Sequence, residues 1–175
     1  MKYFYRLRPM RQEEETYLKE MLFEAIYLPE PLKKQLSREI LLHPDLIVYY
    51  ENWGHNGDIA IVAEHIINNV LLACVWGRLF SPDRKGFGFV DENTPEISIA
   101  VRSGFKNKGI GTKLLRKILK EYQRAGFKKV SLSVSKQNPS VDLYIREGFK
   151  VYIENEEDYI MIFNLNKLSR KKHVP

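Results

Sequence analysis

The sequence of 175 residues contains a single cysteine, Cys74, so an internal disulfide is excluded. Cys74 lies in the apolar segment "VLLACVWG", which is typical of a buried strand, and we interpret it as part of the core and not as a nucleophile. No apolar run approaches the roughly 20 residues of a membrane-spanning helix. The first residues, "MKYFYRLRPM", lack the apolar stretch of a signal peptide. We therefore expect a cytoplasmic protein with no membrane partner.

Histidine is also scarce: the four histidines are His43, His55, His65 and His173. None of them lies near another at metal-ligand spacing, so we expect no metal site. Positive charge, by contrast, is in excess. The net charge is +6 and the isoelectric point is about 9.3. Basic residues are densest over 102–120 and in the tail 169–175, "SRKKHVP". This charge suggests an anionic partner, which could be nucleic acid, a membrane surface or a phosphorylated cofactor.

The length of 175 residues predicts a single domain over residues 1–175, which ends in the basic tail at 169–175. Apolar periodicity predicts its helices and strands. The expected strands cover 3–10, 58–66, 70–80, 96–101, 128–136 and two stretches within 149–165. The expected helices cover 12–28, ended by Pro29 and Pro31, and 38–42, 45–54, 110–125 and 139–147. This order predicts an α+β fold with a central sheet flanked by helices.

The segment "FKNKGIGTKLL" places Gly109 and Gly111 between a predicted strand and a predicted helix. A helix N-terminus binds phosphate when the backbone can be approached closely, which glycine allows. A turn with solvated lysines is the simpler alternative. Two well-known phosphate loops do not fit. A P-loop would need Lys-Ser/Thr where Ile110-Gly111 stands, and a dinucleotide fingerprint would need glycine at Leu114.

Together, "EISIAV…FKNKGIGTKLL" resembles the acetyl-CoA signature of the GNAT N-acetyltransferase superfamily, [RQ]xxGx[GA] after a strand, with Lys106 at its first position. Downstream, "NPSVDLYIREGF" resembles the second signature of that family, with Asn138, Tyr144, Gly148 and Phe149 in its places. The Asn-to-Tyr spacing is six residues where seven is also common, so Gln137 is an alternative to Asn138. The resemblance covers residues 60–165 well.

The resemblance implies a GNAT-like fold, with a mostly antiparallel, twisted central sheet, and acetyl-CoA as cosubstrate. The strand of Ile99, Ala100 and Val101 would splay from its neighbour and bind the pantetheine arm, and Asn138 and Tyr144 would contact the cofactor. The backbone from Lys106 to Thr112 would bind the pyrophosphate: Lys106, Asn107, Lys108, Gly109, Ile110, Gly111 and Thr112. The acetyl group would pass directly to a primary amine in a ternary complex.

Two residues are candidates for proton transfer. Tyr144 would protonate the leaving sulfur, or it is an aromatic on the buried face of a short helix. Glu96 would take a proton from the amine through water, or it is a solvated acid at a strand end. Strand alternation places Glu96, Ser98 and Ala100 on one face, opposite Ile97, Ile99 and Val101. Asp91 and Glu92 are the rivals of Glu96 as base, or they are acids that bind the acceptor.

The glycine-rich segment 85–93, "KGFGFVDEN", is expected to form a mobile lid over the acceptor. Trp53, Phe87 and Phe89 would line this lid, whereas Trp76 in mid-strand is expected to be core. The acceptor is expected to be a small-molecule or peptide amine, and its identity is open. A homodimer formed through a C-terminal strand is possible. A catalytically silent CoA-binding sensor is the first alternative function, and a basic nucleic-acid binder ranks last because no recognition motif is present, so nucleic acid is not expected as a partner.

Overall fold

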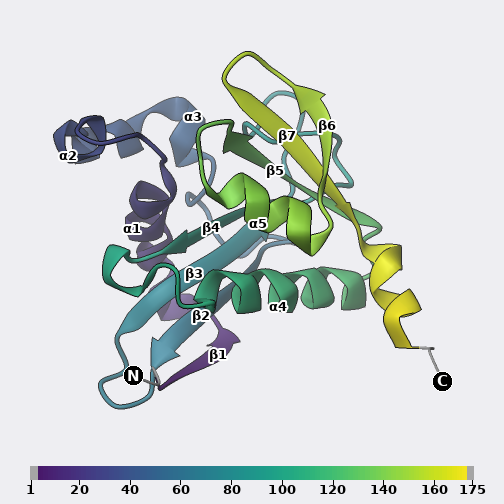
Figure 1. Ribbon diagram of the computed structural model, residues 1–175, viewed down its shortest axis with the longest axis horizontal. Helices are drawn as coiled ribbons and strands as arrows, with labels where there is room; N and C mark the ends of the chain where they lie inside the picture. Colours follow the sequence, from purple (N-terminus) through teal and green to yellow (C-terminus); the bar gives the residue numbers. More distant parts are fainter. Residues whose placement is uncertain (1–3, 173–175) are drawn as a thin grey trace.

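The computed structural model describes residues 4–172, with side chains described for residues 4–168. Seven strands form one sheet in the order β1-β2-β3-β4-β5-β7-β6, in which the β4–β5 pair is parallel and the other pairs are antiparallel (Figure 1). The α+β class with a mostly antiparallel central sheet is confirmed. The strands are β1 Tyr5–Pro9, β2 Ile59–His65, β3 Leu71–Arg78, β4 Glu96–Val101, β5 Lys129–Ser135, β6 Lys150–Glu154 and β7 Asp158–Asn164.

Helices cover both faces of the sheet. Figure 1 shows α4 and α5 in front of it, whereas α1 lies behind. The α-helices are α1 Thr16–Ala25, α2 Leu32–Gln35, α3 Pro44–Ile47, α4 Ile110–Arg124 and α5 Ser140–Glu147. Short 3-10 helices are η1 Gln12–Glu14, η2 Arg38–Leu42, η3 Ser103–Phe105 and η4 Leu165–Lys172. No helix in the described part of the chain is both long and apolar enough to cross a membrane.

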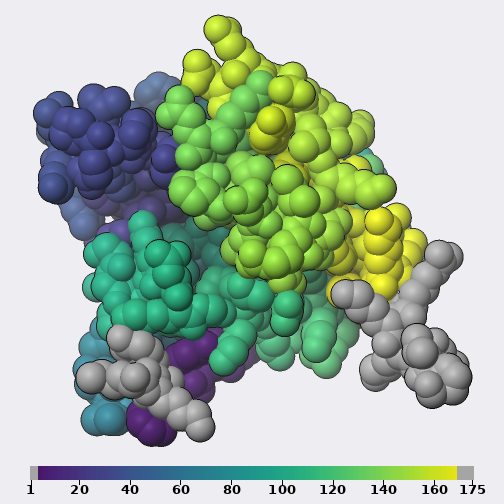
Figure 2. Space-filling model, in the orientation of Figure 1, coloured from purple at the N-terminus to yellow at the C-terminus, as the bar shows by residue number. Residues whose placement is uncertain are grey.

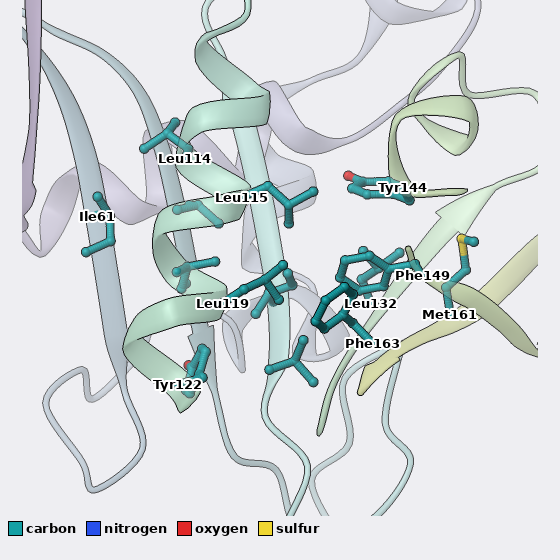
Figure 3. Close-up of a cluster of buried hydrophobic side chains, with 14 of the residues drawn as sticks. Ile61, Leu114, Leu115, Leu119, Tyr122, Leu132, Tyr144, Phe149, Met161 and Phe163 are labelled. Atoms are coloured by element: carbon teal, nitrogen blue, oxygen red, sulfur yellow. The ribbon is translucent and has the colours of Figure 1, made fainter. Parts of the chain in front are cut away.

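Each face of the sheet has its own apolar core. The core under α4 and α5 includes Leu115, Tyr144 and Phe163 (Figure 3). Ile97 of β4 belongs to the same core. The core under α1 contains Cys74, Trp76 and Ala100, which confirms the core assignments of Cys74 and Trp76. Burial raises the pKa of the Cys74 thiol, which suits a packing role. Since Ile97 and Ala100 lie in opposite cores, the alternation expected along β4 is confirmed.

The first helix is shorter than expected. Residues 12–14 form η1, and α1 ends at Ala25, before the prolines. The ammonium of Lys33 donates hydrogen bonds to the carbonyls of Phe23 and Ile26, at 2.6 and 2.7 Å. These bonds satisfy carbonyls that a longer helix would have used, so a side chain and not a proline accompanies the end of α1.

The helix expected over 45–54 is only four residues long, because core side chains take the carbonyls that follow it. Trp76 Nε1 donates to Tyr49 O at 3.1 Å, and Arg78 donates to the carbonyls of Val48 and Glu51 at 2.9 and 2.8 Å. These carbonyls are therefore directed at β3 and not along a helix axis. Tyr49 is fixed in place as a result, which matters for the site below.

Strands β4 and β5 separate after their first pair. Glu96 is in register with Ser131, and Ser131 N donates to Pro95 O at 2.9 Å, but no later residue of β4 pairs with β5. The splay that the family resemblance implied is therefore present. Of the tail expected at 169–175, residues 169–172 belong to η4. The side chains of 169–172 and the whole of residues 173–175 lie outside what the structure describes.

Candidate active site

A cavity of about 940 Å³ opens at the point where β4 and β5 separate. The segment from α1 to α2 forms one wall, and the loop before α4 together with α5 forms the others. In Figure 2 the blue, teal and light green surfaces of these segments meet around this hollow. The cavity is thus built from parts of the chain that lie far apart in the sequence.

Most of the residues expected at the site line this one cavity: Glu96, Ile99, Ala100, Val101, Lys106, Asn107, Gly109, Gly111, Thr112, Asn138 and Tyr144. Five other candidates do not line it: Lys108, Ile110, Gln137, Asp91 and Glu92. The Ile110 side chain is buried in the core, and Lys108 Nζ donates to Gly104 O at 2.7 Å. Asp91 is occupied by Lys129 at 2.7 Å, which holds the pKa of its carboxyl below the usual value.

The start of α4 presents bare backbone to the cavity. Gly109 is the N-cap residue in the left-handed conformation, with φ +76°, and no side chain caps the helix. The first N–H to bond within the helix is that of Lys113, which donates to Gly109 O at 3.2 Å. The N–H groups of Ile110, Gly111 and Thr112 precede it and lack an intrahelical partner. Such a helix start carries a partial positive charge and suits an anion.

Glycine is needed at position 111 for a different reason than at position 109. A Cβ added at Gly111 would meet only Val101 and Ile99 side-chain atoms, at 3.7 and 3.9 Å, which is ordinary contact. The helix therefore does not need glycine there for packing. What glycine provides is open space beside the helix start and β4, on the wall of the cavity.

The backbone of β4 contributes to the same wall. Arg102 N donates to Leu72 O on the β3 side at 3.0 Å. Because hydrogen bonding alternates along an antiparallel pair, the groups of Ile99 and Val101 are directed away from β3, toward β5. Strand β5 has diverged at this point, so these groups are available to an extended ligand.

Asn138 and Tyr144 come from α5 and the turn before it. Asn138 Oδ1 accepts from Ser140 N at 2.9 Å, which fixes Asn138 at the cavity wall, whereas Gln137 is directed elsewhere. Tyr144 is 6% exposed and packs edge-on to Phe149, with the ring centroids 5.7 Å apart. Its hydroxyl points toward α4 in Figure 3. Burial raises the pKa of Tyr144, so its phenol holds its proton at neutral pH.

Glu96 is buried at the inner end of the cavity, with 4% of its surface exposed. Tyr49 donates its hydroxyl proton to Glu96 Oε1 at 2.7 Å, while Oε2 has no partner among the described residues. Desolvation raises the pKa of Glu96 to about 7, against the opposing effects of the Tyr49 hydrogen bond and, less strongly, of the backbone N–H of Gly88. Glu96 is therefore not a solvated strand-end acid. Its partner Tyr49 has no motif around it and was missed by the sequence analysis.

The glycine-rich segment covers Glu96 closely. Phe87 N donates to the hydroxyl of Tyr49 at 2.6 Å, and the two rings stack with centroids 6.2 Å apart. A Cβ at Gly86 would collide with Glu96 Oε2, and one at Gly88 would lie 2.7 Å from the backbone of Leu132. The two glycines therefore permit close packing, which is a different reason from the mobility expected of them. Of the aromatics expected here, Phe87 lines the cavity, whereas Trp53 and Phe89 pack beside the core.

The described residues contain no group of three or more His, Cys, Asp or Glu side chains arranged to hold a metal ion. The cavity is lined by backbone amides, by the buried carboxyl of Glu96 and by the buried phenols of Tyr49 and Tyr144. Further polar side chains line it as well: Glu24, Tyr27, Glu30, Lys33, Lys106, Asp142 and Arg146. Such a set suits an anion with an extended polar arm and a step that moves protons.

Comparison with known proteins identifies the family. The model of the Acetyltransferase (GNAT) family matches residues 19–149, which is most of the chain, so the chain belongs to the GNAT acetyltransferase family. A search of curated protein sequences gave no significant match.

Several solved structures share the fold. One is YncA from Salmonella typhimurium, a putative acetyltransferase with its cofactor acetyl-CoA; it is 20% identical with a TM-score of 0.65, and the match covers 98% of this chain and 96% of YncA. Another is the PaiA N-acetyltransferase from Thermoplasma acidophilum in complex with coenzyme A; it is 21% identical with a TM-score of 0.59, and the match covers 91% of this chain and 98% of PaiA. A third is the spermidine/spermine N-acetyltransferase SpeG from Vibrio cholerae; it is 17% identical with a TM-score of 0.61, and the match covers 97% of this chain and 98% of SpeG.

Proposed function

We propose that this protein is an acetyl-CoA-dependent N-acetyltransferase that moves an acetyl group to a primary amine by direct attack in a ternary complex. One observation carries the proposal. A single cavity contains the unpaired amides at the start of α4, the free edge of β4, a buried carboxyl and a buried phenol. Solved structures of the same fold hold coenzyme A or acetyl-CoA, which supports this cosubstrate.

The cavity fits coenzyme A by its chemistry. Its phosphates are anionic, and the first turn of α4 places Gly111 and Thr112 on the cavity wall together with Lys106 and Arg146. The pantetheine arm carries amides, which pair with backbone groups such as those of Ile99 and Val101. Within the loop Lys106 to Thr112, Lys108 and Ile110 contribute through their backbone only, since their side chains are directed elsewhere.

Acetyl-CoA, when bound, supplies the thioester carbonyl. Glu96 takes the proton of the attacking amine through water, and a carboxyl with a pKa of about 7 is well matched to that task near neutral pH. Tyr144 keeps its phenolic proton and donates it to the departing sulfur. These are the two proton-transfer roles of the reaction, and both side chains line the same cavity.

The acceptor is a small-molecule or peptide amine, and we propose a cationic one. The α1–α2 wall of the cavity carries apolar residues together with Glu24, Glu30 and Lys33. The ammonium of Lys33 donates to the carbonyls of Phe23 and Ile26, so the two carboxylates outnumber one engaged cation. Carboxylates at that wall attract an ammonium group before it is deprotonated. The reducing cytoplasm is the proposed location, since the one cysteine is buried as a thiol.

The test is binding followed by turnover. Acetyl-CoA should raise the melting temperature, because a ligand that binds only the folded state stabilises it. Release of the CoA thiol should then be measured over a panel of polyamines, aminoglycosides, amino acids and peptide amines. Unchanged melting curves up to millimolar acetyl-CoA would refute the proposal. Binding without turnover on any amine would instead support a silent CoA-binding sensor.

We also propose a homodimer through β6. This strand ends the sheet order, and it exposes Val151, Tyr152 and Ile153. In an antiparallel pairing about Tyr152, Lys150 would face Glu154 of a second copy, so the edge is complementary to itself. Tyr152→Glu should convert a dimer to a monomer in sedimentation velocity. A wild-type protein that is monomeric at high concentration would refute this surface.

A further inference from the structure

Tyr49 is held on every side. Its side chain is buried, its carbonyl accepts from Trp76 Nε1 at 3.1 Å, and its ring lies edge-on to Phe80 and stacked on Phe87. A side chain fixed in this way keeps its hydroxyl at one point. That point lies between the Glu96 carboxyl and the backbone of the glycine-rich segment.

When Glu96 is ionised, the direction of both hydrogen bonds at this hydroxyl is determined. The N–H of Phe87 can only donate, so the Tyr49 oxygen accepts from it at 2.6 Å. The single proton of Tyr49 is then left for Glu96 Oε1, at 2.7 Å. Oε1 is thereby occupied, and Oε2 is the carboxyl oxygen without a geometric hydrogen bond among the described residues, although the backbone N–H of Gly88 also acts on this carboxyl and lowers its pKa.

We propose that Tyr49 is a positioning residue for Glu96: its hydroxyl occupies Oε1, leaves Oε2 to receive the proton of the amine, and ties the covering segment to the carboxyl through Phe87. This inference rests on the proposed acetyltransferase function. It adds a residue outside both sequence motifs, and it assigns one carboxyl oxygen to the protein and the other to the reaction. It also explains why glycine stands at Gly86 and Gly88, since the cover must approach the carboxyl closely.

The charged groups on neighbouring elements are engaged elsewhere. Arg78 of β3 is opposite Glu96 in register, but its guanidinium binds Asp58 and the carbonyls around Val48. On β5, Ser131 is in register with Glu96, and its Oγ has no partner among the described residues.

Four further charged groups lie around the covering segment and α3. Lys129 pairs with Asp91, and Lys85 lies over the ring of Phe89. Asp45 of α3 is exposed beside His43. Within the described residues, Tyr49 is therefore the one side chain that donates to the Glu96 carboxyl.

The decisive variant is Tyr49→Phe, which removes the hydroxyl and keeps the ring contacts. A hydrogen bond to the carboxylate favours the ionised form, so its loss should move the titration of Glu96 to higher pH by about one unit. The titration is followed directly in protein with 13C-labelled glutamate carboxyls, and Glu96→Gln identifies the signal. The acid limb of the kcat/KM profile should move by the same amount, with acetyl-CoA affinity kept.

Tyr50→Phe is the matched control. The hydroxyl of Tyr50 donates to Leu41 O at 2.7 Å and has no contact with Glu96, so its removal should leave the titration in place. A second variant works in the opposite direction: 3-fluorotyrosine at position 49 is a stronger donor and should lower the pH of the Glu96 titration. This variant keeps the hydroxyl and does not depend on the folding of Tyr49→Phe.

The outcomes distinguish the positioning role of Tyr49 from the role of Glu96 as base. A Glu96 titration that is unmoved in both the Tyr49→Phe and the fluorotyrosine proteins overturns the positioning role. A fall in activity without movement of the titration overturns it as well, because that is the signature of a structural role. Full turnover by Glu96→Gln would instead refute Glu96 as the base in the proposed function, while the carboxyl titration would still decide whether Tyr49 controls Glu96.

Discussion

Glu96 should make the protein less stable as the pH rises, and Glu96→Gln should remove that effect. The ordinary pKa of the carboxyl is 4.5, and burial raises it to about 7 in the folded protein. Between these values the folded state holds a proton that the unfolded chain releases, so the free energy of unfolding falls with increasing pH. Each pKa unit corresponds to about 1.4 kcal/mol, so the full penalty is about 3 kcal/mol. It is absent below pH 4.5 and complete above pH 7.

The assay is urea unfolding of both proteins from pH 4 to pH 9. Other carboxyls contribute with the opposite sign: arginines hold the pKa of Glu64 at about 2, so its contribution is lost only as the pH falls toward that value. Such contributions are common to both proteins and cancel in the difference. We expect Glu96→Gln to gain about 3 kcal/mol relative to wild type between pH 4.5 and pH 8. A difference that stays constant with pH would refute the buried, protonated carboxyl. Glu154→Gln, at an exposed position, controls for the substitution itself.

Three further variants test the rest of the site. Gly111→Asp should abolish acetyl-CoA binding in calorimetry, because a carboxylate would fill the space beside the α4 amides and repel phosphate; tight binding by a folded variant, verified by circular dichroism, would place the phosphates elsewhere. Tyr144→Phe should lower kcat by roughly 10²–10⁴-fold and spare cofactor affinity, and wild-type turnover would exclude the proton-donor role. Gly88→Ala would place a Cβ 2.7 Å from the backbone of Leu132 and Ser133, so it should cost about 1–3 kcal/mol in urea unfolding and reduce turnover while acetyl-CoA still binds. An unchanged free energy of unfolding would show that the covering segment can move away from β5 at little cost, and would contradict the close packing inferred at Gly88.

The cofactor side of the site could be predicted because its residues are close in sequence and their chemistry is backbone chemistry. Gly109 and Gly111 leave the backbone bare at a predicted helix start, and the alternation along β4 follows from strand geometry alone. Sequence spacing does not predict the direction in which an individual side chain of the loop points. Ile110 belongs to the same loop as Gly109, yet it is buried in the core, and Gln137 and Asn138 are told apart only by the turn that places Asn138 at the cavity.

The acid–base side of the site depends on contacts that local sequence does not encode. Tyr49 and Glu96 are 47 positions apart, and they meet because core residues of β3 take the backbone carbonyls around Tyr49 and end α3 early. The sequence around Glu96 suggests an exposed strand end, and only the cover supplied by Gly86 and Gly88 makes it buried. Burial is also what raises the pKa of Glu96 toward neutrality. The same packing that destabilises the protein above pH 7 therefore gives the carboxyl the proton affinity that a base for an amine requires.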